Sequence, residues 1–142
     1  RRDYDKALEL WHRGGELGCA MSHHSIGIAY LNGEGVGRDM KKVKQYWELA
    51  AMGGHVIARY NLGAFEAQGG NVNRAMKHWM ISAGAGHDIA LEAIRQSYLD
   101  GYVTKTDFEG ALRGHKEAKD GMKSDQREAA AAFYSQAPGN YM

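Results

Sequence analysis

The sequence predicts an all-α chain of stacked antiparallel helix pairs, an α-solenoid. Trp11, Trp47 and Trp79 recur with steps of 36 and then 32 residues, and a repeat of this length is typical of solenoids. A glycine stands seven residues after each tryptophan, at Gly18, Gly54 and Gly86. A further column holds side chains that can cap a helix start, at Asp3, Asp39, Asn71 and Asp107. We therefore expect about three and a half repeats.

Two kinds of helix are expected in each repeat, because apolar residues recur at helical spacing in two segments per unit. The helices that carry the tryptophans, here called B helices, are expected over residues 3–17, 39–52, 71–85 and 105–121. The A helices are expected over residues 20–30, 56–67 and 88–99. In the second B helix Val43, Trp47 and Ala50 form a buried face, while its lysines point outward.

The domain organisation follows from these columns. Residues 1–121 are expected to form the solenoid, with a half repeat at 3–17 and units at 18–53, 54–85 and 86–121. The last unit is degenerate, because His115 stands where tryptophan is expected. Residues 122–142 are interpreted as a C-terminal capping helix or tail that begins at Ser124 or Asp125 and frays beyond Pro138. Phe133 and Tyr134 either dock on the last repeat or occupy the groove of a neighbouring molecule, and the sequence leaves both alternatives open.

Composition limits the classes of partner. A chain of 142 residues fits one domain. With 18 basic and 17 acidic residues, nothing in the net charge favours nucleic acid or an anionic membrane as a partner. No apolar stretch approaches the length of a membrane span, so membrane insertion is not expected. Cys19 is the single cysteine, which rules out an internal disulfide and favours a reducing compartment such as the cytoplasm.

Glycines serve two different purposes in this sequence. Gly27 and Gly63 occupy equivalent points in the A helices, where we expect them to let two helix backbones approach closely. The glycine-rich segment 32–38 is a turn rather than a phosphate cradle, because Arg38 stands at the final glycine position of a dinucleotide motif and no strand precedes the segment.

Residues 18–55 resemble one full Sel-1-like repeat, a helical hairpin related to the tetratricopeptide repeat. The match includes Gly27, Tyr30, the glycine-rich turn, Trp47 and the Gly54-His55 end of the unit. The second unit has Phe65 and Glu66 where tyrosine is expected, and the third has Ile94 and Arg95 at the leucine-glycine positions. The resemblance covers about residues 3–121.

This resemblance implies a right-handed α-solenoid that acts as an adaptor or scaffold for a protein or peptide partner, without catalysis. Because the chain opens with a B helix, Leu8, Leu10 and Trp11 are expected to be partly uncovered. A homodimer formed through this half repeat is therefore a possible arrangement.

Helical-repeat proteins commonly bind partners on the concave face that A helices line, so we predict the partner-binding residues among outward A-helix positions. Aromatic, arginine and asparagine side chains suit the capture of a peptide. The predicted residues are Met21, His23, His24, Ser25, Ile28, Arg59, Tyr60, Asn61, Phe65, Glu92, Arg95 and Gln96.

No metal, cofactor or catalytic group is predicted. His55 and His87 follow the repeat glycines and are interpreted as structural residues at a turn, and the adjacent His23 and His24 cannot both face one ion from a helix. Cys19 is the best reactive candidate, yet we interpret it as a small buried residue. The alternative function is a small hydrolase with β-lactamase-like activity on the same scaffold, as described for cysteine-rich bacterial relatives, but this chain lacks their paired cysteines.

Overall fold

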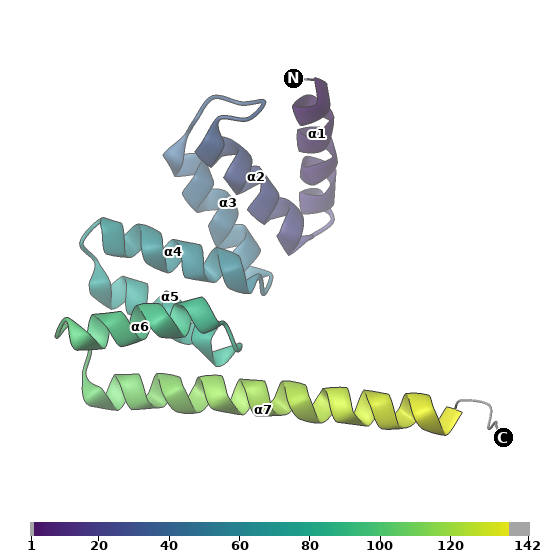
Figure 1. Cartoon of the computed structure of the whole chain (residues 1–142). Coiled ribbons are helices and arrows are strands. Elements are labelled where there is room, and N and C mark those ends of the chain that lie inside the picture. Colours follow the sequence, from purple (N-terminus) through teal and green to yellow (C-terminus); the bar gives the residue numbers. More distant parts are fainter. Residues whose placement is uncertain (1, 137–142) are drawn as a thin grey trace.

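The computed structural model describes residues 2–136, which form seven α-helices and no strand (Figure 1). In chain order these are α1 (Arg2–Glu16), α2 (Ala20–Asn32), α3 (Met40–Met52), α4 (Val56–Gln68), α5 (Val72–Gly84), α6 (Asp88–Leu99) and α7 (Lys105–Gln136). Consecutive helices pack against one another, and α7 also packs against α5. The all-α repeat architecture predicted from the sequence is therefore confirmed, with α1, α3, α5 and α7 as B helices.

A left-handed glycine makes each turn from a B helix into the next A helix. Gly18, Gly54 and Gly86 have φ values of 83°, 90° and 90°, a conformation that glycine adopts without steric cost. The next position in this column is Met122, and there the chain does not turn. Instead α7 runs as one helix to Gln136. The expectation of a separate helix that begins at Ser124 or Asp125 is thus wrong. The expected fraying beyond Pro138 lies outside the described residues.

Two of the three A helices, α4 and α6, begin with a histidine cap. His55 Nδ1 accepts a hydrogen bond from the Ala58 amide at 3.1 Å, and His87 Nδ1 accepts one from the Ala90 amide at 3.2 Å. The interpretation of both histidines as structural residues at a turn is confirmed. Each cap satisfies one of the free amides of the first helical turn.

The acidic and amide column predicted to cap the B helices does so only once. Asp39 accepts from the amides of Lys41 and Lys42. Asn71 makes no side-chain cap, and its side-chain Nδ2 donates to the Glu66 carboxylate instead. Asp107 lies inside α7, where its own amide donates to the Thr104 hydroxyl. Asp3 lies in the first turn of α1.

The core repeats a contact between an indole ring and a glycine. A Cβ atom placed on Gly27 would lie 2.5 Å from Trp47 Nε1, and one on Gly63 would lie 2.4 Å from Trp79 Nε1. The glycines therefore make room for the indole of the following B helix, and not for a second helix backbone as the sequence suggested. The third unit has lost both partners of this contact, since Arg95 and His115 occupy the two positions.

The first half repeat is better covered than expected. Leu8 is only 7 % exposed, because the loop between α2 and α3 folds over α1 and brings Gly35 against Leu8 and Tyr4. Trp11 is half-buried, and Leu10 is exposed. Of the three apolar residues expected to be partly uncovered, Leu10 and Trp11 are so and Leu8 is not.

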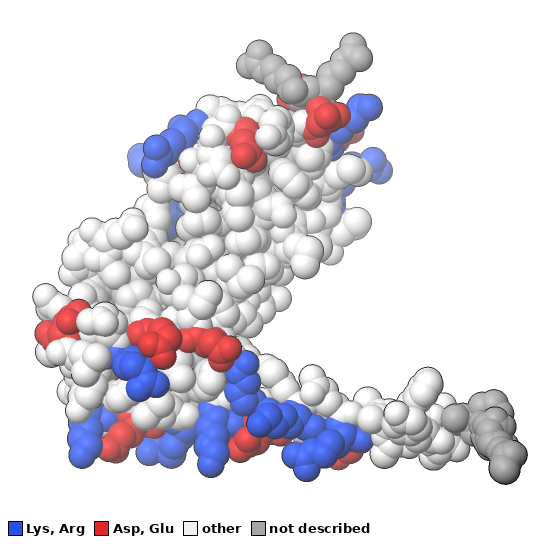
Figure 2. Space-filling view, viewed as in Figure 1, with Lys and Arg blue, Asp and Glu red and all other residues white. Residues whose placement is uncertain are grey.

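The opposite end of the solenoid is polar. Figure 2 shows Lys and Arg side chains, with acidic residues between them, along the lower side of α7. The exposed basic residues of this helix include Lys105, Arg113, Lys116 and Lys123. A polar outer face is typical of a repeat that no neighbouring repeat covers. Beyond the body of the solenoid α7 projects freely (Figure 1).

Candidate partner-binding surfaces

A hollow of about 160 Å³ lies between the ends of α2 and α4 and the face of α3. Two residues of the predicted set, Asn61 and Phe65, line it on α4, and Gln68 adds a second amide. The full lining consists of Leu31, Met40, Trp47, Asn61, Ala64, Phe65 and Gln68. None of these side chains is ionisable. We call this site the α4 hollow.

Stacked rings adjoin Trp47, which lines the α4 hollow. The ring of His24 stacks on Trp47 with centroids 6.3 Å apart and on His55 with centroids 4.3 Å apart. His24 Nε2 also lies 3.5 Å from the amide nitrogen of Asn61. Burial, with a smaller effect from the charge of His55, lowers the pKa of His24. The ring therefore favours its neutral form, which suits a packing and hydrogen-bonding role.

The indole N–H groups of the two core tryptophans differ in their hydrogen bonding. Trp79 Nε1 donates to the Tyr60 carbonyl at 3.3 Å. Trp47 Nε1 is buried and has no hydrogen-bond partner among the described residues. An unpaired buried donor costs about 1–3 kcal/mol. The indole N–H of Trp47, which lines the α4 hollow, therefore lacks the hydrogen bond that stabilises Trp79.

Arg59 and Tyr60, also predicted to bind a partner, make contacts within the solenoid. Arg59 Nη2 donates to the Ala51 carbonyl at 3.3 Å, and its Nη1 lies 3.5 Å from His78 Nδ1. Burial and then the charge of Arg59 lower the pKa of His78. The ring of Tyr60 stacks on Trp79 with centroids 6.5 Å apart. Both side chains thus connect α4 to α5.

The remaining predicted residues are dispersed. His23 packs on Tyr46, Ile28 packs against the core of the first unit, Ser25 is half-buried, and Met21 is exposed at the start of α2. On α6 the exposed side chains pair among themselves or with neighbours. Arg95 Nε donates to Glu92 at 3.1 Å, and Gln96 donates to Asp100 at 3.0 Å. The structure therefore brings together His24, Asn61 and Phe65 and leaves the α6 residues apart.

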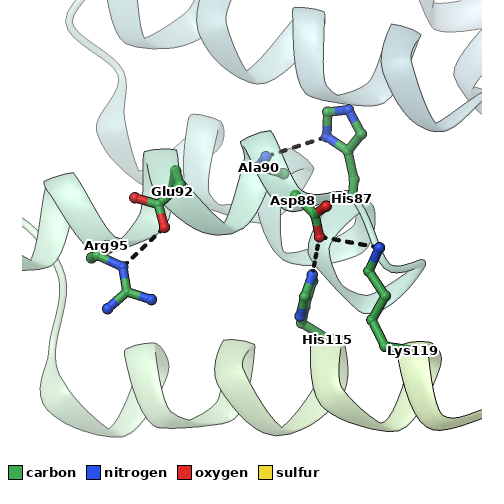
Figure 3. Close-up of polar contacts among 7 residues, drawn as sticks. All are labelled: His87, Asp88, Ala90, Glu92, Arg95, His115 and Lys119. Carbon is green, nitrogen blue, oxygen red and sulfur yellow. Dashed lines mark hydrogen bonds and ion pairs between the residues drawn. The ribbon is translucent and has the colours of Figure 1, made fainter.

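A polar clip holds α7 on α6 (Figure 3). Asp88 Oδ1 lies 2.7 Å from His115 Nε2 and 3.2 Å from Lys119 Nζ. These hydrogen bonds, first from His115 and then from Lys119, lower the pKa of the exposed Asp88 carboxyl. His115 therefore has a new partner in place of the glycine contact that tryptophan makes in the other units.

A second and larger hollow, of about 740 Å³, lies along the outer face of α5 beside the loop that precedes α7. We call it the α5 groove. Its lining residues are Asn73, Met76, Lys77, Met80, Ile81, Tyr102, Val103 and Asp107. The predicted set contains none of them, because that set was limited to outward positions of the A helices. The signal available in the sequence was Tyr102, an aromatic residue in a turn, which is 66 % exposed.

The position of Cys19 differs from the one expected from the sequence. It is exposed, and not buried as predicted, because it precedes α2 at the cap position that His55 and His87 occupy elsewhere. Hydrogen bonds from Ser22, its side chain first and then its amide, lower the pKa of the thiol. In the described part of the chain, no group of three or more His, Cys, Asp or Glu side chains is arranged to hold a metal ion. None of the described helices has the length and apolar character of a membrane span.

Comparison with known proteins identifies the fold. No protein-family model matches the sequence. A Sel1 repeat protein from Oxalobacter formigenes superposes with a TM-score of 0.68 and 25 % identity over 85 % of this chain and 51 % of that one. A protective antigen present in uropathogenic Escherichia coli strains, which displays an SLR fold, gives a TM-score of 0.65 and 26 % identity over 80 % of this chain and 25 % of that one. The chain thus spans about half and a quarter of the lengths of these two proteins, and it is a helical repeat protein of the Sel1-like (SLR) type.

Proposed function

We propose that the chain is a non-catalytic interaction module that captures a peptide segment of a partner protein in the α4 hollow. The observation that carries this proposal is the chemistry of the lining, which combines aromatic, aliphatic and amide side chains with no ionisable group. Such a surface holds an apolar side chain by burial and a peptide backbone by hydrogen bonds, and it offers neither a nucleophile nor a general base. Protein binding is also the usual role of the SLR fold.

The geometry of the hollow indicates how a peptide would be held. Trp47 and Phe65 form its apolar walls, and the amides of Asn61 and Gln68 belong to the same face of α4 at a spacing of seven residues. Side chains seven apart on a helix lie on one face about 10 Å apart along its axis, which is roughly the length of three extended residues. We therefore expect an extended segment with one apolar side chain inserted between two backbone contacts.

The hydrolase alternative has no supporting observation in the described residues. Asp88, His115 and Lys119 form a cluster of ionisable groups at the α6–α7 contact, where the Asp88 side chain is 71 % exposed. Their hydrogen bonds hold two helices together and surround no hollow that could bind a substrate.

A peptide-display selection against the immobilised chain, followed by anisotropy titration of the selected peptides, tests this proposal. Phe65→Ala should weaken binding roughly tenfold or more, as expected for an aromatic contact at the centre of an interface, and Asn61→Ala should weaken it several-fold. Gln96→Ala, a predicted residue outside the hollow, serves as the matched control and should leave affinity unchanged. Circular dichroism verifies that each variant is folded. Selected peptides that bind all three variants with the affinity of the native chain would show that the α4 hollow is not the binding site.

A further inference from the structure

The last 15 residues of α7, 122–136, are here called the α7 overhang, and of these Met122 contacts Gly86 of the solenoid. From residue 123 onward every residue of the overhang is exposed. Its two aromatic residues, Phe133 and Tyr134, are 70 % and 75 % exposed and contact each other edge to face. Because α7 is one continuous helix that points away from the body (Figure 1), the overhang cannot fold back onto its own solenoid. Among the described residues, no other surface of the chain covers these rings.

The overhang is amphipathic and has two flanks of opposite charge. At 100° per residue, Ala129 and Phe133 lie within about 40° of each other on the helix surface, with Gln126 beside Phe133. They continue the line of Met122, whose side chain contacts Gly86 of its own solenoid. Asp125 and Glu128 fall on one side of this apolar stripe, and Lys123 and Arg127 fall on the other. The overhang thus presents an apolar edge between an acidic flank and a basic flank.

The α5 groove has the complementary arrangement. Its apolar surface is formed by Met76, Met80, Ile81, Tyr102 and Val103. Lys77 stands on the α5 wall, and Asp107 stands on the opposite wall at the start of α7. Methionine side chains adapt to the shape of an inserted group, and a groove of this kind typically accepts the apolar face of an amphipathic helix.

We propose that the α7 overhang of one copy of this chain docks in the α5 groove of a second copy. The acidic flank of the overhang then meets Lys77, and the basic flank meets Asp107. Reversing the direction of the inserted helix would exchange the flanks, so the charges select one direction. The overhang, about 22 Å long, exceeds the roughly 12 Å that α5 spans from Asn73 to Ile81, so the apolar surface of the groove can be covered in full.

The contact is heterologous, because the overhang and the groove are different surfaces of the same chain. Each copy keeps one free overhang and one free groove after docking, so association continues head to tail unless the copies close into a ring. This inference concerns a different surface from the α4 hollow and does not depend on the proposed peptide binding.

Sedimentation velocity over a range of concentrations tests the proposal. The native chain should show an average mass that rises with concentration through the micromolar range, about 1–100 μM, as expected for a contact of modest area. A native chain that sediments as a single copy throughout this range would overturn the proposal and leave the groove for a different partner.

Two variants assign the contact to its two surfaces. The overhang variant Phe133→Ala/Tyr134→Ala and the groove variant Lys77→Glu/Ile81→Asp change exposed side chains only, so both should fold as the native chain does. Each alone should associate at least roughly tenfold more weakly than the native chain. An equimolar mixture should form a pair and stop there, since it contains one intact overhang and one intact groove per pair. A mixture that associates no better than either variant alone would contradict the assignment.

A charge-exchange experiment distinguishes this specific contact from non-specific association. Lys77→Glu alone should weaken association roughly three- to tenfold, and adding Asp125→Lys/Glu128→Lys in the same chain should restore most of the loss. Lys41→Glu, a charge reversal at an exposed position of α3, is the matched control and should have no effect. If Lys41→Glu weakens association as much as Lys77→Glu does, the charges act through the overall field of the molecule and the docked geometry is wrong.

Discussion

Replacing Gly63 by alanine tests the contact that organises each repeat. The added Cβ would lie 2.4 Å from Nε1 and 2.5 Å from Cδ1 of Trp79, whereas ordinary contacts between such atoms begin at about 3.5 Å. The indole must therefore shift by about 1 Å, and it is only 7 % exposed, so the shift disturbs the core. The same shift strains the hydrogen bond from Trp79 Nε1 to the Tyr60 carbonyl.

Three contributions set the change in the free energy of unfolding that Gly63→Ala causes. Overpacking a core costs about 1–3 kcal/mol, and the lost hydrogen bond costs about 1 kcal/mol. Alanine returns about 1 kcal/mol in helix propensity. We expect Gly63→Ala to lower the free energy of unfolding by about 2 kcal/mol, which for a chain of this size corresponds to a fall in Tm of roughly 5 °C.

Two further glycines provide the controls. Gly84 lies in α5 with no atom within 4 Å of its added Cβ, so Gly84→Ala should be neutral or stabilising by about 0.5 kcal/mol. Gly27 faces Trp47, whose Nε1 has no hydrogen bond to lose, so Gly27→Ala should cost about 1 kcal/mol less than Gly63→Ala. Urea unfolding followed by circular dichroism and tryptophan fluorescence gives the three values. If Gly63→Ala proves as stable as Gly84→Ala, the indole does not depend on the glycine and the reasoning fails.

Three further predictions concern the stability of the chain. Burial lowers the pKa of four histidines, His24, His55, His78 and His87. Unfolded chains therefore bind more protons than folded ones as the pH falls through the ordinary histidine pKa of 6.5. Stability should be complete above about pH 7 and decline from there to about pH 5. A thermal melt that is flat across this range would contradict the sign. His55→Ala should cost about 1 kcal/mol by removing the cap of α4, while His55→Asn should retain most of it. Glu66→Gln should destabilise the chain by about 1–2 kcal/mol, because Glu66 is 8 % exposed and pairs with Lys44 at 3.3 Å, and a Lys44→Met/Glu66→Gln double variant should recover part of the loss.

The sequence predicted the helices closely, because two periodicities coincide in this chain. The apolar spacing within each helix and the recurrence of tryptophan and glycine between helices both place the A helices expected over 56–67 and 88–99 within one residue of α4 and α6. The candidate site was predicted less well. Asn61 and Phe65 line the α4 hollow, but Arg59 and Tyr60 share their helix and turn toward α5. Helical position alone does not tell which neighbour a long side chain reaches.

Substitutions that replace a repeat residue by one of different chemistry were the hardest to interpret. Glu66 occupies the position of Tyr30 and Tyr98, two residues that stack on rings of their own B helices. The structure gives Glu66 two polar partners, Lys44 and Asn71, and so explains why Asn71 fails to cap α5. A repeat pattern indicates where a residue lies, whereas the partners of an exceptional residue depend on side chains from three helices at once.

Met122 connects the fold to the inferred assembly. It stands in the column of Gly18, Gly54 and Gly86, whose left-handed backbone turns each B helix into the next A helix. A methionine pays about 1–2 kcal/mol to adopt that conformation, whereas continuing the helix costs nothing, and the four alanines at 129–132 favour helix further. The missing glycine therefore accounts for the overhang, and the same straight helix carries Phe133 away from the described part of the solenoid, to a position where the inferred contact with a second copy can bury it.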